Sequence, residues 1–265
     1  MSCSMPRSMD SNQQATDGVS NLYAVIPAAG SGQRMKSAVP KQYLKLDGIS
    51  VLQHTVSRML EIEAIKKVVV VVDQEGSQTI DSVLQTSDRV DICTGGESRA
   101  ESVSNGLSYL QSTIQSGTHL PDNNAGTDSS SSDNWVLVHD AARPCVRTKD
   151  ILRLIQSVYG SSDGGLLARP VTDTIKKSDS DGRIEDTVDR DFLWSAATPQ
   201  MFRLDTLLDA LQAAIENQVA ITDEASAMQR SGYRPALIEC HSDNIKITTS
   251  SDLVLAQHYL QAQLD

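Results

Sequence analysis

The residues best suited to chemistry lie in one loop, PAAGSGQRM from Pro27 to Met35, and in Pro40-Lys41-Gln42 just after it. Small side chains allow main-chain N–H groups to approach a ligand, and consecutive N–H groups in such a turn bind anions. Arg34 and Lys41 add two positive charges nearby. These residue types at this spacing predict a polyphosphate site; the alternative is an ordinary strand-to-helix turn.

Two familiar phosphate-binding loops do not fit this stretch. A P-loop requires a glycine directly before Lys-Ser, whereas Met35 precedes Lys36-Ser37. A dinucleotide fingerprint requires Gly-x-Gly-x-x-Gly. Gly30 and Gly32 fit that pattern, but its third position is again Met35. The loop therefore belongs to neither class.

The run from Trp135 to His139 predicts a strand. It ends in a charged cluster, Asp140-Ala141-Ala142-Arg143-Pro144. Open α/β sheets place their ligand sites at the carboxyl ends of strands. Asp140 is therefore expected to lie at a ligand site. We expect His139 to be a packed histidine and not an acid or base.

The composition restricts the class of protein. The chain has 265 residues and a net charge of −11, from 23 Lys and Arg against 34 Asp and Glu, which suits one large domain. Nucleic-acid binders show a basic face, and the sequence has no basic run. Four scattered cysteines without a Cys-x-x-Cys pair argue against zinc and disulfides. Without an apolar run of membrane-spanning length or a signal peptide, a cytoplasmic protein is expected.

Hydrophobic periodicity predicts a domain over residues 21–265, after a polar extension over 1–20 that is expected to be disordered. Residues 115–134 are expected to form a low-complexity surface loop. The predicted strands span 22–27, 68–72, 90–93, 135–139, 165–170 and 235–239, with an extended piece at 243–248; the predicted helices span 51–60, 77–86, 148–158 and 204–216 and begin near 99, 222 and 251. This alternation is typical of a Rossmann-like α/β fold, a mostly parallel twisted sheet with helices on both faces.

Residues 171–194 interrupt this alternation and predict a β-hairpin arm, with a turn at Ser180-Asp181-Gly182. A polar, exposed hairpin is only marginally stable alone. We therefore expect the arm to pack against a second subunit, giving a homodimer.

Taken together, these stretches closely resemble 2-C-methyl-D-erythritol 4-phosphate cytidylyltransferases, the CTP-using enzymes of the non-mevalonate isoprenoid pathway. The resemblance runs from about residue 22 to 262, and its blocks keep the family's order. The matching blocks are 27–35, 40–43, 95–96, 139–144, 173–174, 187–190, 198–200, 222–226 and 243–246. The resemblance implies a nucleotidyltransferase fold and transfer of CMP from CTP to the acceptor, giving 4-diphosphocytidyl-2-C-methyl-D-erythritol and pyrophosphate.

The implied reaction is a single displacement. The acceptor's phosphate oxygen attacks the α-phosphorus of CTP in line, and pyrophosphate leaves with Mg²⁺ bound mainly through the CTP phosphates. The protein then needs to supply positioning and positive charge, not a nucleophile. By resemblance, Arg34 and Lys41 are the catalytic residues that stabilise the transition state.

The resemblance also implies two binding sets. CTP would be bound by Ala28, Ala29, Gly30, Gly32, Gly96, Glu97, Ser102, Asp140 and Ala141. Asp140 would accept a hydrogen bond from a ribose hydroxyl or from a Mg²⁺-bound water. It is not assigned as a direct metal ligand, because Mg²⁺ keeps several waters and binds through substrate phosphates. Glu97 departs from the Asp common at its position, which lengthens the acceptor by one methylene. The acceptor phosphate would be bound by Arg190, Lys246, Thr174, Arg143, Thr198 and Thr222.

Within the second set, Thr174 and Arg190 lie on the hairpin, and the resemblance implies that they reach into the other subunit's site. Each of three members has a simpler alternative: a salt bridge for Arg143, a solvated charge for Arg190 and a helix cap for Thr222.

Three other functions stay open from the sequence. A ribitol-5-phosphate cytidylyltransferase would share the loop, Lys41 and a related Asp-Ala-x-Arg-Pro turn, whereas the blocks 187–190 and 243–246 favour the methylerythritol substrate. A nicotinamide-dependent oxidoreductase is disfavoured by Met35 at the third glycine position. A nucleotide-binding regulator without activity is disfavoured because Arg34 and Lys41 are both present.

Overall fold

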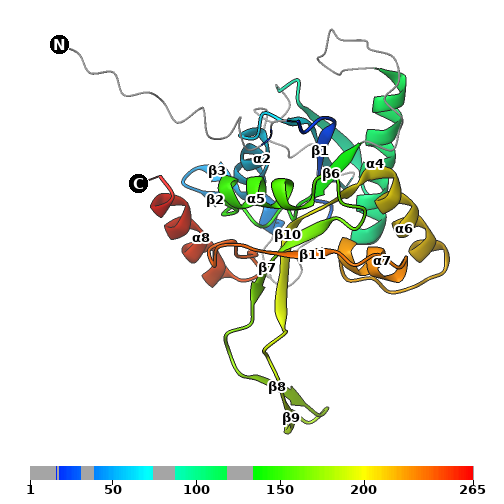
Figure 1. Ribbon diagram of the computed structural model, residues 1–265. Helices are drawn as coiled ribbons and strands as arrows, with labels where there is room; N and C mark the ends of the chain where they lie inside the picture. Colours follow the sequence, from blue (N-terminus) through cyan, green and yellow to red (C-terminus); the bar gives the residue numbers. More distant parts are fainter. Residues whose placement is uncertain (1–15, 17, 31–38, 74–86, 118–133, 265) are drawn as a thin grey trace.

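The computed structural model describes residues 16, 18–30, 39–73, 87–117 and 134–264. Within them the chain forms one twisted sheet with helices on both faces and a hairpin that projects from the body (Figure 1). The predicted α/β class is confirmed. The predicted helix at 77–86, and most of the stretches 1–20 and 115–134, lie outside the described residues.

The central sheet contains seven strands in the order β11-β7-β10-β6-β1-β4-β5. Its strands are β1 (Leu22–Pro27), β4 (Ile65–Val72), β5 (Val90–Thr94), β6 (Trp135–Val138), β7 (Gly165–Pro170), β10 (Trp194–Arg203) and β11 (Ala236–Glu239). Only β10 is antiparallel to its neighbours. β4 and β6 flank β1 on opposite sides, so the strand order reverses there. The crevice at the carboxyl ends of β1 and β6 is therefore the position at which such sheets bind ligands.

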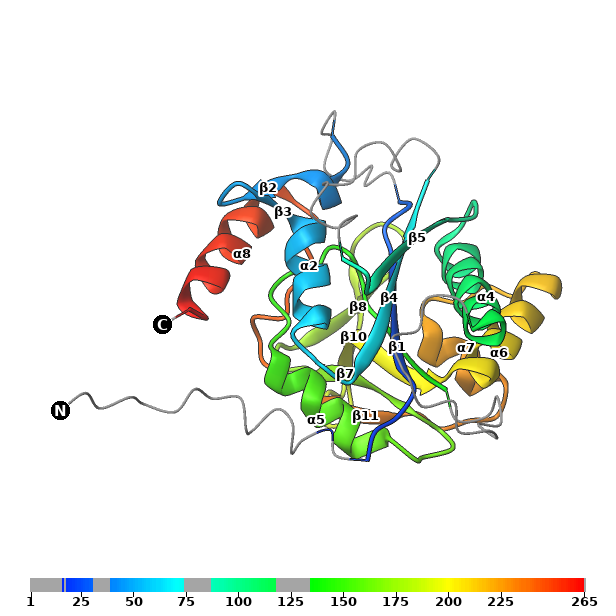
Figure 2. The same ribbon diagram turned by 90° about the horizontal axis from the view of Figure 1, so that it is seen from above.

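Helices cover the two faces of the sheet, which Figure 2 shows nearly edge-on. One face carries α2 (Val51–Leu60) and α5 (Thr148–Val158); the other carries α4 (Arg99–Ser116), α6 (Leu204–Glu216) and α7 (Glu224–Arg230). The C-terminal helix α8 (Ser250–Ala262) contacts β2 (Lys45–Leu46), which pairs with β3 (Ile49–Ser50).

The two apolar layers meet in the valines of β4. Val68, Val70 and Val72 belong to the core under α2 and α5, whereas Val69 and Val71 belong to the core under α4 and α6. Successive side chains of a strand point to opposite faces, so a continuous valine run is what a strand covered on both sides requires. On the α4 side, a Cβ at Gly106 would lie 2.7 Å from Val71 Cγ2. Glycine there allows α4 to pack closely against the sheet.

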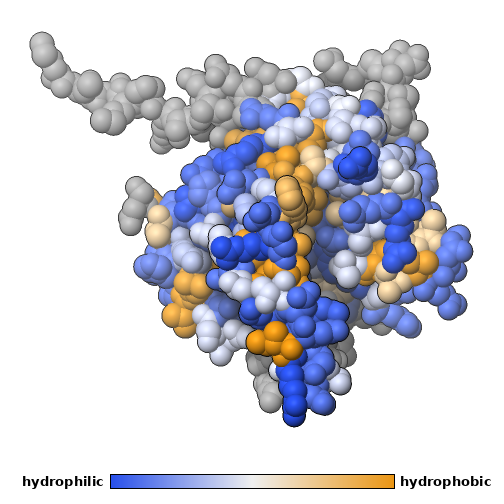
Figure 3. Space-filling model, turned by 60° about the horizontal axis from the view of Figure 1, so that its bottom comes forward, coloured by the Kyte–Doolittle hydropathy of each residue, from blue (hydrophilic) through white to orange (hydrophobic). Residues whose placement is uncertain are grey.

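The projecting hairpin consists of β8 (Ile175–Ser178) and β9 (Ile184–Val188), which pair only with each other within the described sheets. Its residues are largely exposed, including Ile184 at 69% and Phe192, just beyond β9, at 91%. Figure 3 looks at the molecule from the hairpin side and shows small hydrophobic patches separated by hydrophilic residues. The predicted exposed hairpin is confirmed.

Two local predictions need correction. Trp194–Arg203 forms β10, a strand that the sequence did not predict. Thr222 is not the helix cap: Asp223 is, because its carboxylate accepts from the Ser226 N–H at 3.0 Å and completes a capping box. The piece predicted as extended at 243–248 joins no sheet among the described residues.

Candidate active site

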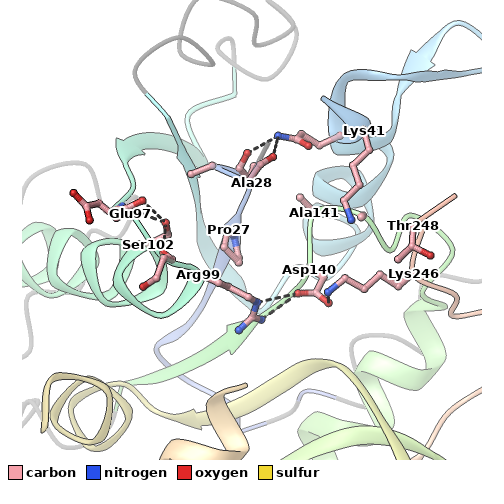
Figure 4. A pocket seen from close by; sticks show the side chains of 16 residues that line it. Pro27, Ala28, Lys41, Glu97, Arg99, Ser102, Asp140, Ala141, Lys246 and Thr248 are labelled. Atoms are coloured by element: carbon pink, nitrogen blue, oxygen red, sulfur yellow. Dashed lines mark hydrogen bonds and ion pairs between the residues drawn. The ribbon is translucent and has the colours of Figure 1, made fainter. Parts of the chain in front are cut away.

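A cavity of about 440 Å³ opens at the carboxyl ends of β1 and β6 (Figure 4). Four segments far apart in sequence meet there: the loop after β1, the turn before α4, the loop after β6 and the segment before α8. The described lining residues are Pro27–Gly30, Lys41, Gln42, Gly96–Arg99, Ser102, Asp140–Ala142, Lys246 and Thr248. The structure thus brings together the two motif groups on which the sequence reading depended.

The loop after β1 is fixed by Gln42, which is buried. Its Nε2 donates to the carbonyl oxygens of Ala28 at 2.7 Å and Gly30 at 3.0 Å. Because both contacts use carbonyls, the neighbouring N–H groups are not consumed by this side chain. Gly32 and Arg34, which were predicted to continue the anion site, lie outside the described residues.

Lys41 begins the short 3-10 helix η2 (Lys41–Tyr43), and its side chain points into the cavity toward Ala141 (Figure 4). Its Nζ donates to the Ile247 carbonyl at 3.0 Å, which connects η2 to the segment before α8. A partly buried ammonium at the rim gives the cavity one of its positive charges.

The turn before α4 is a rigid wall of the cavity. A capping box joins Ser98 and Glu101, and Glu101 Oε2 also accepts from the Glu97 N–H at 2.7 Å. The hydroxyl of Ser102 accepts from the Gly96 N–H at 3.2 Å and donates to the Ser98 carbonyl at 2.9 Å. The Glu97 side chain is exposed at this wall.

Asp140 is the electrostatic centre of the site. Its Oδ2 contacts Lys246 Nζ at 2.9 Å and Arg143 Nε at 3.3 Å, and its Oδ1 accepts from Arg99. Burial alone would raise the pKa of this carboxyl, but Arg99, Lys246 and Arg143 together hold it well below its usual range. These three cations therefore favour the ionised form of Asp140. The salt-bridge alternative for Arg143 is the arrangement observed.

Arg99 is the site residue that sequence reasoning missed. It opens α4, and its guanidinium contacts Asp140 Oδ1 through Nε at 3.3 Å and Nη2 at 3.1 Å. The same group contacts both carboxylate oxygens of the fully buried Glu224, at 2.6 and 3.2 Å. Burial would lower the pKa of Arg99, but Glu224 and Asp140 raise it. The adjacent acids Asp223 and Glu224 were a usable signal, since only one of them can cap the helix.

His139 lies behind the cavity and is fully buried, as predicted for a packed histidine. Thr198 Oγ1 accepts from the Asp140 N–H at 3.0 Å and lies 2.9 Å from His139 Nδ1. His139 Nε2 lies 3.1 Å from the Arg143 carbonyl, which can only accept, so Nε2 carries the proton and donates to it. In the neutral ring Nδ1 then accepts from the Thr198 hydroxyl. Burial lowers the pKa of His139 to about 4, despite opposing contributions from these neighbours.

The predicted acceptor residues fall into two groups. Lys246 lines the cavity, while Arg143 is buried beneath it and also donates to the Asn244 carbonyl at 2.9 Å. Thr198 is occupied by His139 and Asp140. Thr174, Arg190 and Thr222 are exposed and do not line the cavity of their own chain. On the hairpin, Arg190 donates to the Thr172 carbonyl.

The fold and the cavity, in which the loop after β1 meets cations around a strand-end aspartate, are those of a nucleotidyltransferase. The model of the 2-C-methyl-D-erythritol 4-phosphate cytidylyltransferase family matches residues 22–117 and 123–262. The chain therefore belongs to this family. It is an enzyme that transfers the cytidylyl group of CTP to 2-C-methyl-D-erythritol 4-phosphate in the non-mevalonate pathway.

Individual relatives agree with this assignment. The 2-C-methyl-D-erythritol 4-phosphate cytidylyltransferases of Vibrio vulnificus (strain YJ016) and Aliivibrio fischeri (strain MJ11) are 44% and 43% identical over 247 and 241 residues. These matches cover 93% and 91% of this chain and 98% and 94% of the relatives. The crystal structure of the Francisella tularensis enzyme aligns with a TM-score of 0.73 at 34% identity, covering 91% of this chain and all of that chain. Of the alternatives left open by the sequence, the family assignment selects the methylerythritol phosphate acceptor.

No helix among the described residues is long and apolar enough to cross a membrane. The part of the chain that the structure describes also contains no group of three or more His, Cys, Asp or Glu that could hold a metal ion.

Proposed function

We propose that CTP occupies the cavity with its triphosphate on the loop after β1 and its base against the turn before α4. The observation that carries this proposal is that Ala28–Gly30, Gly96–Ser102 and Asp140–Ala141 line one cavity. In this arrangement Gly96 and Ser102 read the cytosine, and Asp140 and Ala141 contact the ribose.

Lys41 and Arg34 would stabilise the charge that develops at the α-phosphorus. The attacking oxygen belongs to the acceptor's own phosphate, so the protein needs no general base, and the neutral, buried His139 is not one. Preorganised cations lower the barrier because their contacts strengthen as charge moves toward the leaving pyrophosphate. Gln42 supports this step indirectly, because it holds the loop that carries the N–H donors.

The residues present fit a Mg²⁺ ion that enters with CTP and not one that resides in the protein. Asp140 is the one buried carboxylate among the described residues that line the cavity, and three cations already surround it. Mg²⁺ commonly binds through one or two carboxylates and substrate phosphates. Asp140 would hold the ion directly or through water, and the bound ion would neutralise charge on the pyrophosphate.

For the acceptor we propose a site shared between two chains, with Lys246 from one chain and Thr174 and Arg190 from its partner. These two hairpin residues are exposed and lie outside their own cavity. The arm also exposes Phe192, and a second cavity of about 750 Å³ lies at its base, lined by Thr172, Ile175 and Ser195 among others. An exposed arm beside a concave surface suits an exchange of arms between copies.

The predicted cytoplasmic location stays a prediction.

Mixed dimers test this proposal. In a dimer of one K41A chain and one R190A chain, a shared site leaves one of the two sites intact, whereas a site within one chain leaves none. Random pairing of equal amounts makes half of the dimers mixed, so about a quarter of wild-type activity should return, by counting sites in a two-fold dimer. Pyrophosphate release from CTP and 2-C-methyl-D-erythritol 4-phosphate measures it.

A matched control variant lies on the same hairpin. Lys177→Ala, in an exposed pair with Glu185, should behave like the wild type. Activity of the mixture no greater than that of the two variants measured separately would refute the shared site. Replacing CTP by other nucleoside triphosphates, or the acceptor by ribitol 5-phosphate, tests the assignment of substrates in the same assay.

A further inference from the structure

Asp140 has two carboxylate oxygens with different partners, and this division assigns a task to Arg99. Oδ2 contacts both Arg143 and Lys246, so the loss of either leaves it paired. Among the described contacts, Oδ1 accepts only from Arg99, through two donors. The orientation of this buried carboxylate therefore depends on Arg99.

Arg99 is held in turn by Glu224. Both oxygens of that carboxylate contact the guanidinium, and the Glu224 side chain is 1% exposed. A planar guanidinium can serve two carboxylates at once, which a lysine ammonium does less well. The resulting chain Glu224–Arg99–Asp140 connects the first turns of α7 and α4 with the end of β6.

This chain joins the two halves of the site. Arg99 follows directly after the Gly96–Ser98 wall, and Glu224 comes two residues after Thr222 on the acceptor side. Gln200 fixes the same end of α7, since its side chain contacts the Asp223 carboxylate at 2.9 Å and the Ala225 N–H at 2.7 Å. One guanidinium therefore connects α7 directly with Asp140.

We infer that Arg99 is a positioning residue for cytidylyl transfer, which sets the orientation of Asp140 and couples the nucleotide wall to α7. The inference rests on the proposed role of Asp140 as a nucleotide-binding group. A competing explanation is that Arg99 merely neutralises the buried charge of Glu224. Removal of Arg99 leaves a buried carboxylate unpaired in either case, so the single variant cannot distinguish them.

The double variant R99M/E224Q distinguishes the two explanations, because glutamine removes the buried charge along with its partner. We expect R99M to lower both Tm and kcat, and R99M/E224Q to recover most of the Tm. The kcat of the double variant should remain at least tenfold below the wild type, because Oδ1 of Asp140 still lacks its donors and small misplacements of reacting groups are costly. A double variant that regains both Tm and kcat within twofold of the wild type would overturn the inference.

Three further variants complete the test. R89M removes a guanidinium that donates to the Leu60, Ile62 and Ile65 carbonyls, before β5 and remote from the cavity; it should lower Tm and keep kcat. If R99M/E224Q does not fold, R99K decides: its kcat should fall about tenfold at an unchanged circular dichroism spectrum, and a kcat within twofold of wild type would refute the positioning role. D140N distinguishes a failure of the proposed nucleotide site from a failure of the role proposed for Arg99. Full activity of D140N would contradict the proposed site itself, whereas an inactive D140N beside a fully active double variant contradicts only the role of Arg99.

Discussion

The substitution of Gly96 by alanine tests the cytosine wall most directly. A Cβ at this position would lie 2.4 Å from Glu101 Cβ and 2.9 Å from Glu101 Oε2. Ordinary contact begins near 3.4 Å, so the wall and the first turn of α4 must separate by about 1 Å, the difference of the two distances. Glu101 Cβ is attached to the helix backbone and cannot rotate away.

A displacement of this size should be costly for the nucleotide. Misplacement of a reacting group by about 1 Å can lower the rate by a hundredfold, and here the displaced group is the base and not the α-phosphorus. We therefore expect kcat/KM for CTP to fall between about tenfold and a hundredfold, or roughly 1.4–2.7 kcal/mol of transition-state stabilisation. The fall should be expressed mainly in the KM for CTP, with a smaller change in the KM for the acceptor.

The control changes Glu101, the residue that a methyl group at Gly96 would meet. E101G removes the Cβ and carboxylate that a Gly96 methyl would meet, at the loss of the capping box. The double variant G96A/E101G should then have the same KM for CTP as E101G alone. A wild-type KM for CTP in G96A, measured by pyrophosphate release, would refute the assignment of this turn to base recognition.

Two other predictions concern residues that hold the site. Gln42→Met removes both donors to the Ala28 and Gly30 carbonyls; kcat/KM for CTP should fall about tenfold and stability by about 1–3 kcal/mol, measured by steady-state kinetics and urea unfolding, and an unchanged kcat/KM would contradict the loop-holding role. His139 has a lowered pKa in the folded protein, from 6.5 to about 4, so the unfolded chain binds more protons between these values and stability should decrease as pH falls through this window. Between pH 7 and 4.5 this group should cost about 2.4 kcal/mol of stability, and His139→Gln should lack this contribution. Urea unfolding at the two pH values measures it, and equal losses in both proteins would refute it.

Much of the fold could be predicted because local patterns and tertiary demands agree. The valines of β4 are apolar on both faces, and the structure buries both faces. β10 escaped prediction because it carries Pro199, which donates no ladder hydrogen bond, and its pairing with β7 shifts between Ala196 and Gln200. A strand with an irregular ladder has no clear period in its sequence.

The residues of the candidate site likewise include some that local motifs predict and one that they do not. Lys41, Asp140 and Lys246 lie in motifs whose residue types indicate phosphate and nucleotide chemistry, and the structure places all three on one cavity. Arg99 could not be assigned because its importance comes from a contact with Glu224, which is 125 positions away. The adjacent acids Asp223 and Glu224 indicate that one of them has a partner other than the helix end, but no local pattern identifies that partner as Arg99, because tertiary packing sets the pairing.

The two-stranded arm has a consequence for how the enzyme responds to its own concentration. A hairpin whose described strands pair only with each other is marginally stable alone. If its acceptor residues act in a partner, dilution below the dissociation constant of the dimer removes catalysis while the seven-stranded body stays intact. Specific activity would then rise with the concentration of the enzyme, and protein present below that dissociation constant would be folded but inactive.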